Sequence, residues 1–159
     1  MLDKLYVLTE EERQELYDAI PVITILIAGA DGKVDDDELE WSKKLTKIRS
    51  YKEEGTMEIF YDKVNEDYNE RLERWNKVLA SQGAKERQEL LSERVAKLNP
   101  ILAKLDPEYG AKLYKSFVTF AEHVAKASGG FFGIGSVSKE ESAIMGLPML
   151  TEITYEEEA

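Results

Sequence analysis

Residues 27–38 read IAGADGKVDDDE: an apolar segment, a glycine turn and a run of acidic residues follow one another. The apolar segment reaches back to Ala19 and is rich in isoleucine, which predicts a helix buried on every side, with a buried strand as the alternative. Gly29 is expected to end this helix with the positive φ that is typical of a C-cap. Asp35 and Glu38 have the spacing of a capping box, so a second helix is expected to begin there.

The residues before this stretch predict where the first helix starts. Thr9 and Glu12 have the spacing of another capping box. Apolar residues then recur at steps of three and four up to the glycine turn. Pro21 has no backbone N–H, so it is expected to kink or divide this helix near Ala19.

Helical spacing also dominates the remainder of the chain. Apolar residues predict a long amphipathic helix over about 54–80 and a further helix over about 84–98. Asp106 and Pro107 predict the N-cap and first residue of another helix. No segment requires a strand, so the sequence predicts an all-α helical bundle.

The helix–turn–helix pattern occurs twice. A shift of 97 positions aligns the first turn, Ala30-Asp31-Gly32, with Ala127-Ser128-Gly129. After the turn the shift becomes 103, which aligns Glu38 with Glu141 and implies a six-residue insertion in the second copy. We expect an internal duplication, with two similar helix pairs related by approximate two-fold symmetry and with both turns close together.

Length bounds the domain organisation. The chain has 159 residues, which fits one domain. We expect residues 1–150 to form this domain and the acidic tail 151–159 to fray. Within the domain, the repeat units are expected at about 9–48 and 107–147, with the central helices at about 54–105.

Charge and composition narrow the function classes. The net charge of −11 disfavours nucleic-acid binding, which needs a basic face. The absence of cysteine excludes disulfides and thiolate ligands and suits a cytoplasmic protein. The longest apolar run, Ala19 to Ala30, would reach about 18 Å as a helix, too short for a bilayer core of about 30 Å. We therefore expect no transmembrane segment, and the charged N-terminal residues predict no secretory signal.

The stretch 27–38 resembles the signature of the TerB-like family, which is named after a tellurite-resistance protein. Members have an apolar helix that ends in Ala-Asp-Gly, a short turn and an acidic helix start. The resemblance covers the two helix pairs, about half of the chain, and implies a helical bundle, metal binding at the turns and a role in chemical stress. The matching site residues are Asp31, Asp35, Glu38 and Glu141. Ser128 and Ser138 stand where the first turn has Asp31 and Asp35, so the second turn departs from the pattern.

The residues of the acidic turn also indicate a cation site, independently of the family resemblance. Five carboxylates lie within residues 31–38, and Ca²⁺ or Mg²⁺ prefers oxygen ligands. The spacing is not that of an EF-hand, because Ile27 and Gly29 would occupy its first and third positions. The alternative is a helix C-cap followed by a solvated acidic helix start.

A glycine-rich loop is expected over residues 129–135. Phe131, Phe132 and Ile134 lie among its glycines, and the spacing fits neither a phosphate-binding nor a dinucleotide-binding loop. These residues either tuck under the bundle as a lid or form an exposed docking loop for a partner. His123, the only histidine, is expected to be an ordinary helix residue.

Three function classes follow from these patterns. The favoured one is a non-enzymatic, cytoplasmic stress-response protein that holds Ca²⁺ or Mg²⁺ at the acidic turn and engages a protein partner. The second is an interaction module without metal, which docks through loop 129–135 or through the aromatic residues of the helix over 54–80. The third is a carboxylate-based enzyme, which requires Glu38 and Glu141 to converge in a cleft. No catalytic residue is assigned.

Overall fold

The computed structural model describes residues 4–30, 36–52, 55–132 and 143–156; for 36–38, 51 and 127–132 it describes the backbone alone. These ranges form η1 (Lys4–Val7), α1 (Glu10–Ala28), α2 (Asp36–Lys52), α3 (Thr56–Glu66), α4 (Tyr68–Leu79), α5 (Ala84–Ala96), α6 (Leu98–Leu102) and α7 (Pro107–Phe132). They contain no strand, so the predicted all-α class is confirmed and the strand alternative for α1 is wrong. No helix within them is long and apolar enough to cross a membrane.

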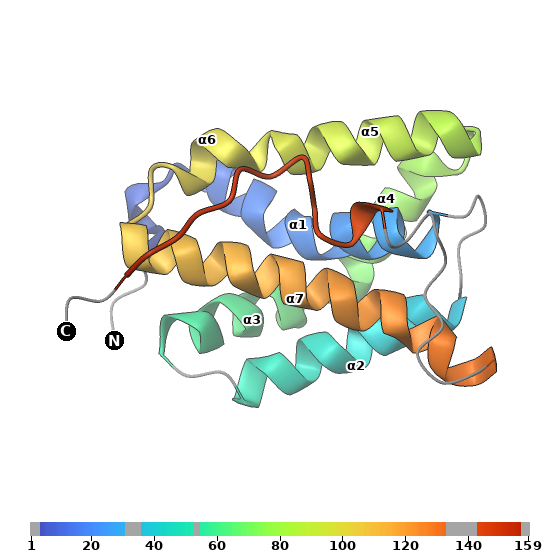
Figure 1. Ribbon diagram of the computed structural model, residues 1–159, viewed down its shortest axis with the longest axis horizontal. Helices are drawn as coiled ribbons and strands as arrows, with labels where there is room; N and C mark the ends of the chain where they lie inside the picture. Colours follow the sequence, from blue (N-terminus) through green and yellow to red (C-terminus); the bar gives the residue numbers. More distant parts are fainter. Residues whose placement is uncertain (1–3, 31–35, 53–54, 133–142, 157–159) are drawn as a thin grey trace.

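Helix α1 forms the centre of the bundle. Every residue from Ala19 to Ala28 is buried, as the apolar run predicts. α1 contacts each of the other six α-helices. Figure 1 shows α5 and α6 along one side, α2 and α3 along the opposite side, and α1 and α7 between them. Pro21 does not divide α1, which runs as one helix from Glu10 to Ala28.

The predicted helix starts are confirmed by hydrogen bonds. The Glu12 backbone N–H donates to Thr9 Oγ1 at 3.2 Å, and the Thr9 N–H donates to Glu12 Oε1 at 3.0 Å. At the start of α7, the Tyr109 N–H donates to Asp106 Oδ2 at 3.2 Å. Thr9 and Asp106 are aligned by the shift of 97, so α1 and α7 begin at equivalent positions of the proposed repeat.

Gly29 ends α1 as expected, but not in the expected conformation. Its φ is −98°, its N–H donates to the Ile25 carbonyl at 2.9 Å, and the Ala30 N–H donates to the Ile27 carbonyl at 3.2 Å. A Cβ at this position would lie 3.1 Å from the Ile25 carbonyl oxygen and 3.3 Å from Arg87 Nη2. The close approach of Arg87, rather than a positive φ, explains the glycine.

The single long helix predicted over about 54–80 is two helices. Asp67 separates α3 from α4 with φ −135° and ψ 27°. The apolar steps of three and four continue across this break, so periodicity did not reveal it. Tyr61, Tyr68 and Trp75 are all buried, at 0%, 3% and 8% exposure. They belong to the core and do not form a docking surface.

The second turn of the repeat is not where the sequence predicts it. Helix α7 continues through Ala127–Gly129 to Phe132. The loop expected over 129–135 is therefore helical over 129–132, and residues 133–135 lie outside the described ranges. Glycine lowers helix stability by about 1 kcal/mol relative to alanine but does not prohibit a helix. The predicted duplication stays a proposal.

The apolar faces of α1 and α7 make up much of the core. Four aligned pairs are completely buried: Leu16 and Leu113, Ile20 and Phe117, Ile23 and Phe120, and Ile27 and Val124. Phe60 of α3 lies against Phe117, with ring centroids 6.0 Å apart.

The segment after the last helix packs along the bundle up to Thr151, and fraying of the tail from Glu152 onward stays a prediction. Leu147 and Leu150 are buried, and Figure 1 shows residues 151–156 running between α6 and α7. Asn99 holds this segment: its Nδ2 donates to the Met149 carbonyl at 3.0 Å, and its Oδ1 accepts from the Thr151 N–H at 2.8 Å.

Candidate functional site

The described part of the structure contains none of the predicted site side chains. Asp31, Asp35, Ile134 and Glu141 lie outside the described residues. Glu38 lies in α2, and Phe131 and Phe132 lie in the last turn of α7; only their backbone is described. Among the described side chains, no group of three or more histidines and carboxylates could hold a metal ion. The candidate site is formed by other residues, which belong to α2 and α7.

Helix α2 faces the bundle with polar side chains. Ser42, Thr46, Arg49 and Ser50 are all buried. The hydroxyls of Ser42 and Thr46 donate to carbonyl groups of α2 itself, at 2.6 Å each. Tyr68 of α4 donates to Ser42 Oγ at 2.8 Å and also bonds with Thr24 of α1 at 2.9 Å, and burial raises the pKa of Tyr68 to about 12. This polar face of α2 leads to Arg49.

Arg49 reaches from α2 into the seam with α7. Its Nη1 donates to Tyr61 Oη at 2.9 Å and to both the hydroxyl and the carbonyl oxygen of Ser116, at 2.9 and 3.0 Å. Its Nη2 donates to Thr119 Oγ1 at 3.2 Å and lies 3.4 Å from His123 Nδ1. The guanidinium also lies over the rings of Tyr61 and Phe120, at 5.3 Å from each centroid.

The contacts of Arg49 are all with neutral groups. The side chain is only 7% exposed, and no carboxylate of the described residues forms an ion pair with it. A buried charge is costly unless it is paired, because the interior solvates it poorly. Hydrogen bonds to hydroxyl and carbonyl oxygens offset part of this cost, and no carboxylate among the described residues compensates the positive charge.

Arg71 shows how the same fold treats another buried arginine. It is 5% exposed, and it pairs with Asp18 and Asp67, each at 2.8 Å. Burial alone would lower the pKa of Arg71, but the hydrogen bonds that it donates to these two carboxylates raise it above its ordinary value. Arg71 is therefore a compensated cation, whereas Arg49 has no carboxylate partner among the residues whose side chains are described.

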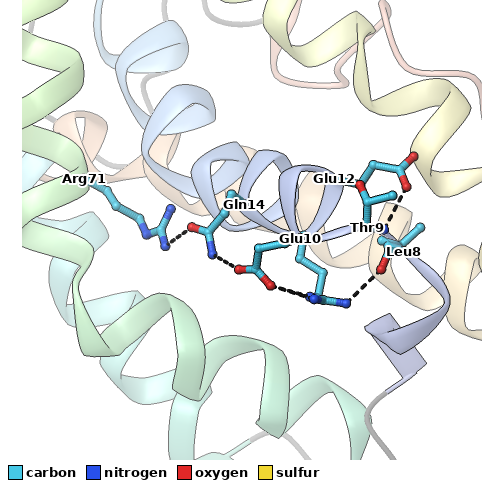
Figure 2. A network of polar contacts seen from close by, with 7 residues as sticks. Leu8, Thr9, Glu10, Glu12, Gln14 and Arg71 are labelled. Atoms are coloured by element: carbon cyan, nitrogen blue, oxygen red, sulfur yellow. Dashed lines mark hydrogen bonds and ion pairs between the residues drawn. The ribbon is translucent and has the colours of Figure 1, made fainter.

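The Arg71 pair belongs to a network that joins α1 to α4. Figure 2 shows its continuation: Arg71 donates to Gln14, and Gln14 donates to Glu10. Glu10 also accepts from Arg13, which donates in turn to the Leu8 carbonyl. Hydrogen bonds from Arg13 and Gln14 lower the pKa of Glu10. Donors and acceptors are matched along this network, so we assign it a structural role.

A pocket of about 270 Å³ opens at the outer end of the Arg49 seam. Trp41 and Leu45 of α2 form one wall, and His123 and Lys126 of α7 form the other. Trp41 is 38% exposed, which leaves part of its indole open to the pocket side of α2. His123 connects the pocket to Arg49, since its Nδ1 is the atom that faces Nη2.

The electrostatics of this pocket are set by cations. A guanidinium offers only N–H donors, so His123 Nδ1 must be the acceptor in this contact and the ring proton lies on Nε2. Burial lowers the pKa of His123, and the charges of Arg49 and Lys126 lower it further against the opposing effect of Glu122. The imidazole is neutral at pH 7, and the two neighbouring cations favour an anion in the pocket.

A larger groove lies on the other side of α7. It has a volume of about 600 Å³ and lies between α7 and residues 152–155. Its walls mix apolar residues such as Val118 and Ile153 with acidic and basic ones. No uncompensated buried charge adjoins it among the residues whose side chains are described, so it specifies a ligand less than the α2–α7 pocket does.

The sequence contains a signal for the α2–α7 site in the spacing of its polar residues. Ser42, Thr46 and Arg49 lie on one face of α2, and Ser116, Thr119 and His123 lie on one face of α7. Both faces combine polar residues with core residues such as Leu45 and Phe120. Two polar stripes of this kind predict that the helices meet each other through them.

Comparisons with known proteins give no independent assignment: no family model, no curated protein and no solved structure matches this chain.

Proposed function

We propose that this chain is a non-enzymatic helical binding protein that holds an anionic ligand at the α2–α7 pocket. The observation that carries the proposal is Arg49, a buried guanidinium whose described partners are all neutral. An anion beside His123 and Lys126 would supply the missing negative charge from the open side of the seam. Because Arg49 is buried, solvent and salt screen this attraction less than they would at the surface.

The proposal is tested by titrating the protein with sodium sulfate and following the imidazole signals of His123 by NMR. His123 is the only histidine, so its signals need no further assignment. Sodium chloride at equal ionic strength is the control for screening. We expect a saturable shift with sulfate and none with chloride. Equal, non-saturating shifts with both salts would refute the proposal.

Two variants locate the site. Lys126→Met removes the accessible cation of the pocket and should weaken sulfate binding at least about fivefold. Lys115→Met removes an equally basic residue from the same helix, but from the groove on the other side of α7, and should leave sulfate binding unchanged. Equal effects of the two variants would show a response to net charge instead of a site.

A second proposal concerns the acidic turn and the TerB-like resemblance. We propose that Asp31, Asp35 and Glu38 bind a divalent cation, with Glu141 as a further ligand if the two turns meet. What supports this is the density of carboxylates between the end of α1 at Ala28 and the start of α2 at Asp36. A role in chemical stress follows only from the resemblance.

Thermal melting separates this second proposal from the alternative of a solvated helix start. Ca²⁺ or Mg²⁺ should raise the melting temperature of the parent chain, and Asp31→Asn should abolish that increase. If none of Ca²⁺, Mg²⁺ and a transition metal changes the melting temperature, no cation is bound at the turn.

A further inference from the structure

We infer that the anion held at the α2–α7 pocket is a small aromatic carboxylate. This inference rests on the proposed function, because it identifies the ligand of that same site. It follows from the chemical difference between the two walls of the pocket, from the exposure of Trp41 and from the size of the pocket.

Among the described side chains, those of the α2 wall are apolar, and those of the α7 wall are the cation Lys126 and the neutral imidazole of His123. Trp41 and Leu45 are one helical turn apart on α2, whereas His123 and Lys126 are one turn apart on α7. A ligand that satisfies both walls has an apolar body on one side and an anionic group on the other. An inorganic anion would use only the α7 wall.

The exposure of Trp41 selects a flat apolar body. Few large apolar residues in the described chain are this exposed, and Trp41 is the only one of them that lines the pocket. An indole offers a broad face on which an aromatic ring stacks with more contact area than a branched aliphatic group can reach. Leu45, which is 7% exposed, is the other described residue of this wall.

Size restricts the ligand further. The pocket holds about 270 Å³, below the range of about 300–1,000 Å³ that is typical of pockets for drug-sized ligands. One or two fused rings with a carboxylate fit this volume. The carboxylate then lies beside Lys126 and the imidazole of His123, whose Nδ1 is 3.4 Å from Arg49 Nη2.

Four probes test the inference on the parent chain by calorimetry and by the His123 NMR signals. Benzoate combines both features, acetate lacks the ring, benzamide lacks the charge, and cyclohexanecarboxylate has a ring that is not flat. We expect the Kd of benzoate to be at least about tenfold lower than that of acetate and of benzamide, and about threefold lower than that of cyclohexanecarboxylate. Acetate as tight as benzoate would overturn the inference.

Sulfate distinguishes failure of this inference from failure of the proposed function. If sulfate binds saturably while benzoate binds no tighter than acetate, the anion site stands and the aromatic specificity is wrong. If neither sulfate nor benzoate shifts the His123 signals, both are wrong.

A matched pair of variants assigns the ring to Trp41. Trp41→Leu keeps an apolar residue and should raise the Kd of benzoate at least about fivefold, a larger factor than its effect on the Kd of sulfate. Tyr155→Leu removes an equally accessible aromatic residue, 48% exposed, from the groove on the other side of α7. If Tyr155→Leu weakens benzoate and Trp41→Leu does not, the ligand binds in that groove and the inference is wrong.

Discussion

Arg49 and Arg71 are buried to nearly the same extent, and the difference between them lies in their partners. Replacing Arg71 by methionine leaves Asp18 and Asp67 without their cation. Because these carboxylates are partly exposed, at 19% and 36%, the expected loss in the free energy of unfolding is roughly 2–4 kcal/mol, somewhat below that of a fully buried pair.

Arg49→Met should lower the free energy of unfolding by less than about 1 kcal/mol. It removes an uncompensated charge, and Tyr61 and Ser116 keep the hydrogen bond of 2.5 Å between their hydroxyls. Urea denaturation of both variants at pH 7 measures the comparison. An equal or larger loss for Arg49→Met would show that a negative partner already compensates this guanidinium in the free protein.

His123 makes stability depend on pH. Three charged groups influence it: Arg49 from α2, and Lys126 and Glu122 from α7. Its folded pKa is lowered below the unfolded value of 6.5, mainly by burial. The unfolded state therefore binds more protons, and the contribution of His123 to stability is present above pH 6.5 and is lost as the pH falls through the folded pKa.

We expect the melting temperature to fall between pH 7 and pH 5.5, and His123→Gln to flatten this dependence. Glutamine can still accept a hydrogen bond from Arg49 but does not titrate. Benzoate should also flatten it, because a bound anion favours the protonated imidazole. A dependence that is unchanged in His123→Gln would assign the pH effect to other groups.

At the scale of the elements, α2 is attached differently from α1. Leu45 is the one buried apolar side chain of α2 among those described, whereas its buried polar residues are Ser42, Thr46, Arg49 and Ser50. Each hydrogen bond contributes about 1 kcal/mol to stability, and hydrogen bonds to water offset part of the loss when the helix opens. An element held in this way opens at lower free energy than one held by apolar burial.

Hydrogen exchange should therefore show α2 opening before the core helices. We expect the amides of residues 42–50 in α2 to exchange at least about tenfold faster than those of residues 20–27 in α1. Saturating benzoate should slow the exchange of α2 selectively, since Trp41 and Leu45 form one wall of the proposed site. Equal protection of α1 and α2 would contradict this account.

The elements also show which features the sequence could predict. Helix starts were predictable because Thr9 and Asp106 place a side-chain oxygen at the only position from which it reaches a free N–H. The break at Asp67 was not, because it leaves the apolar period intact on both sides. The continuation of α7 past Ala127 depends on packing along the whole helix, which a local glycine signal does not report.

For the whole molecule, burial of the apolar stripes on α1 and α7 was predictable, whereas the α2–α7 pocket was not. Arg49 and His123 are 74 positions apart, and neither belongs to a motif. Their proximity results from the register of two helices against a common core. Local residue patterns predicted the helices, whereas the candidate site forms only where α2 packs against α7.

Truncation after Leu150 tests how much the C-terminal tail contributes to stability. A chain that ends after Leu150 lacks the expected acidic tail, including the bond from Thr151 to Asn99 and the half-buried Ile153 beside Gly110. One hydrogen bond and part of an isoleucine side chain amount to about 2 kcal/mol, so the truncated chain should fold with that loss in the free energy of unfolding.

Benzoate binding should survive this truncation, because the tail residues line the groove on the other side of α7 and not the α2–α7 pocket. Urea denaturation and calorimetry on the truncated chain measure both quantities. A truncated chain that does not fold would show that the tail belongs to the core unit. If the truncated chain folds but no longer binds benzoate, the ligand binds in the groove beside Ile153 and Tyr155. The positive charge of Arg49 would then need another partner.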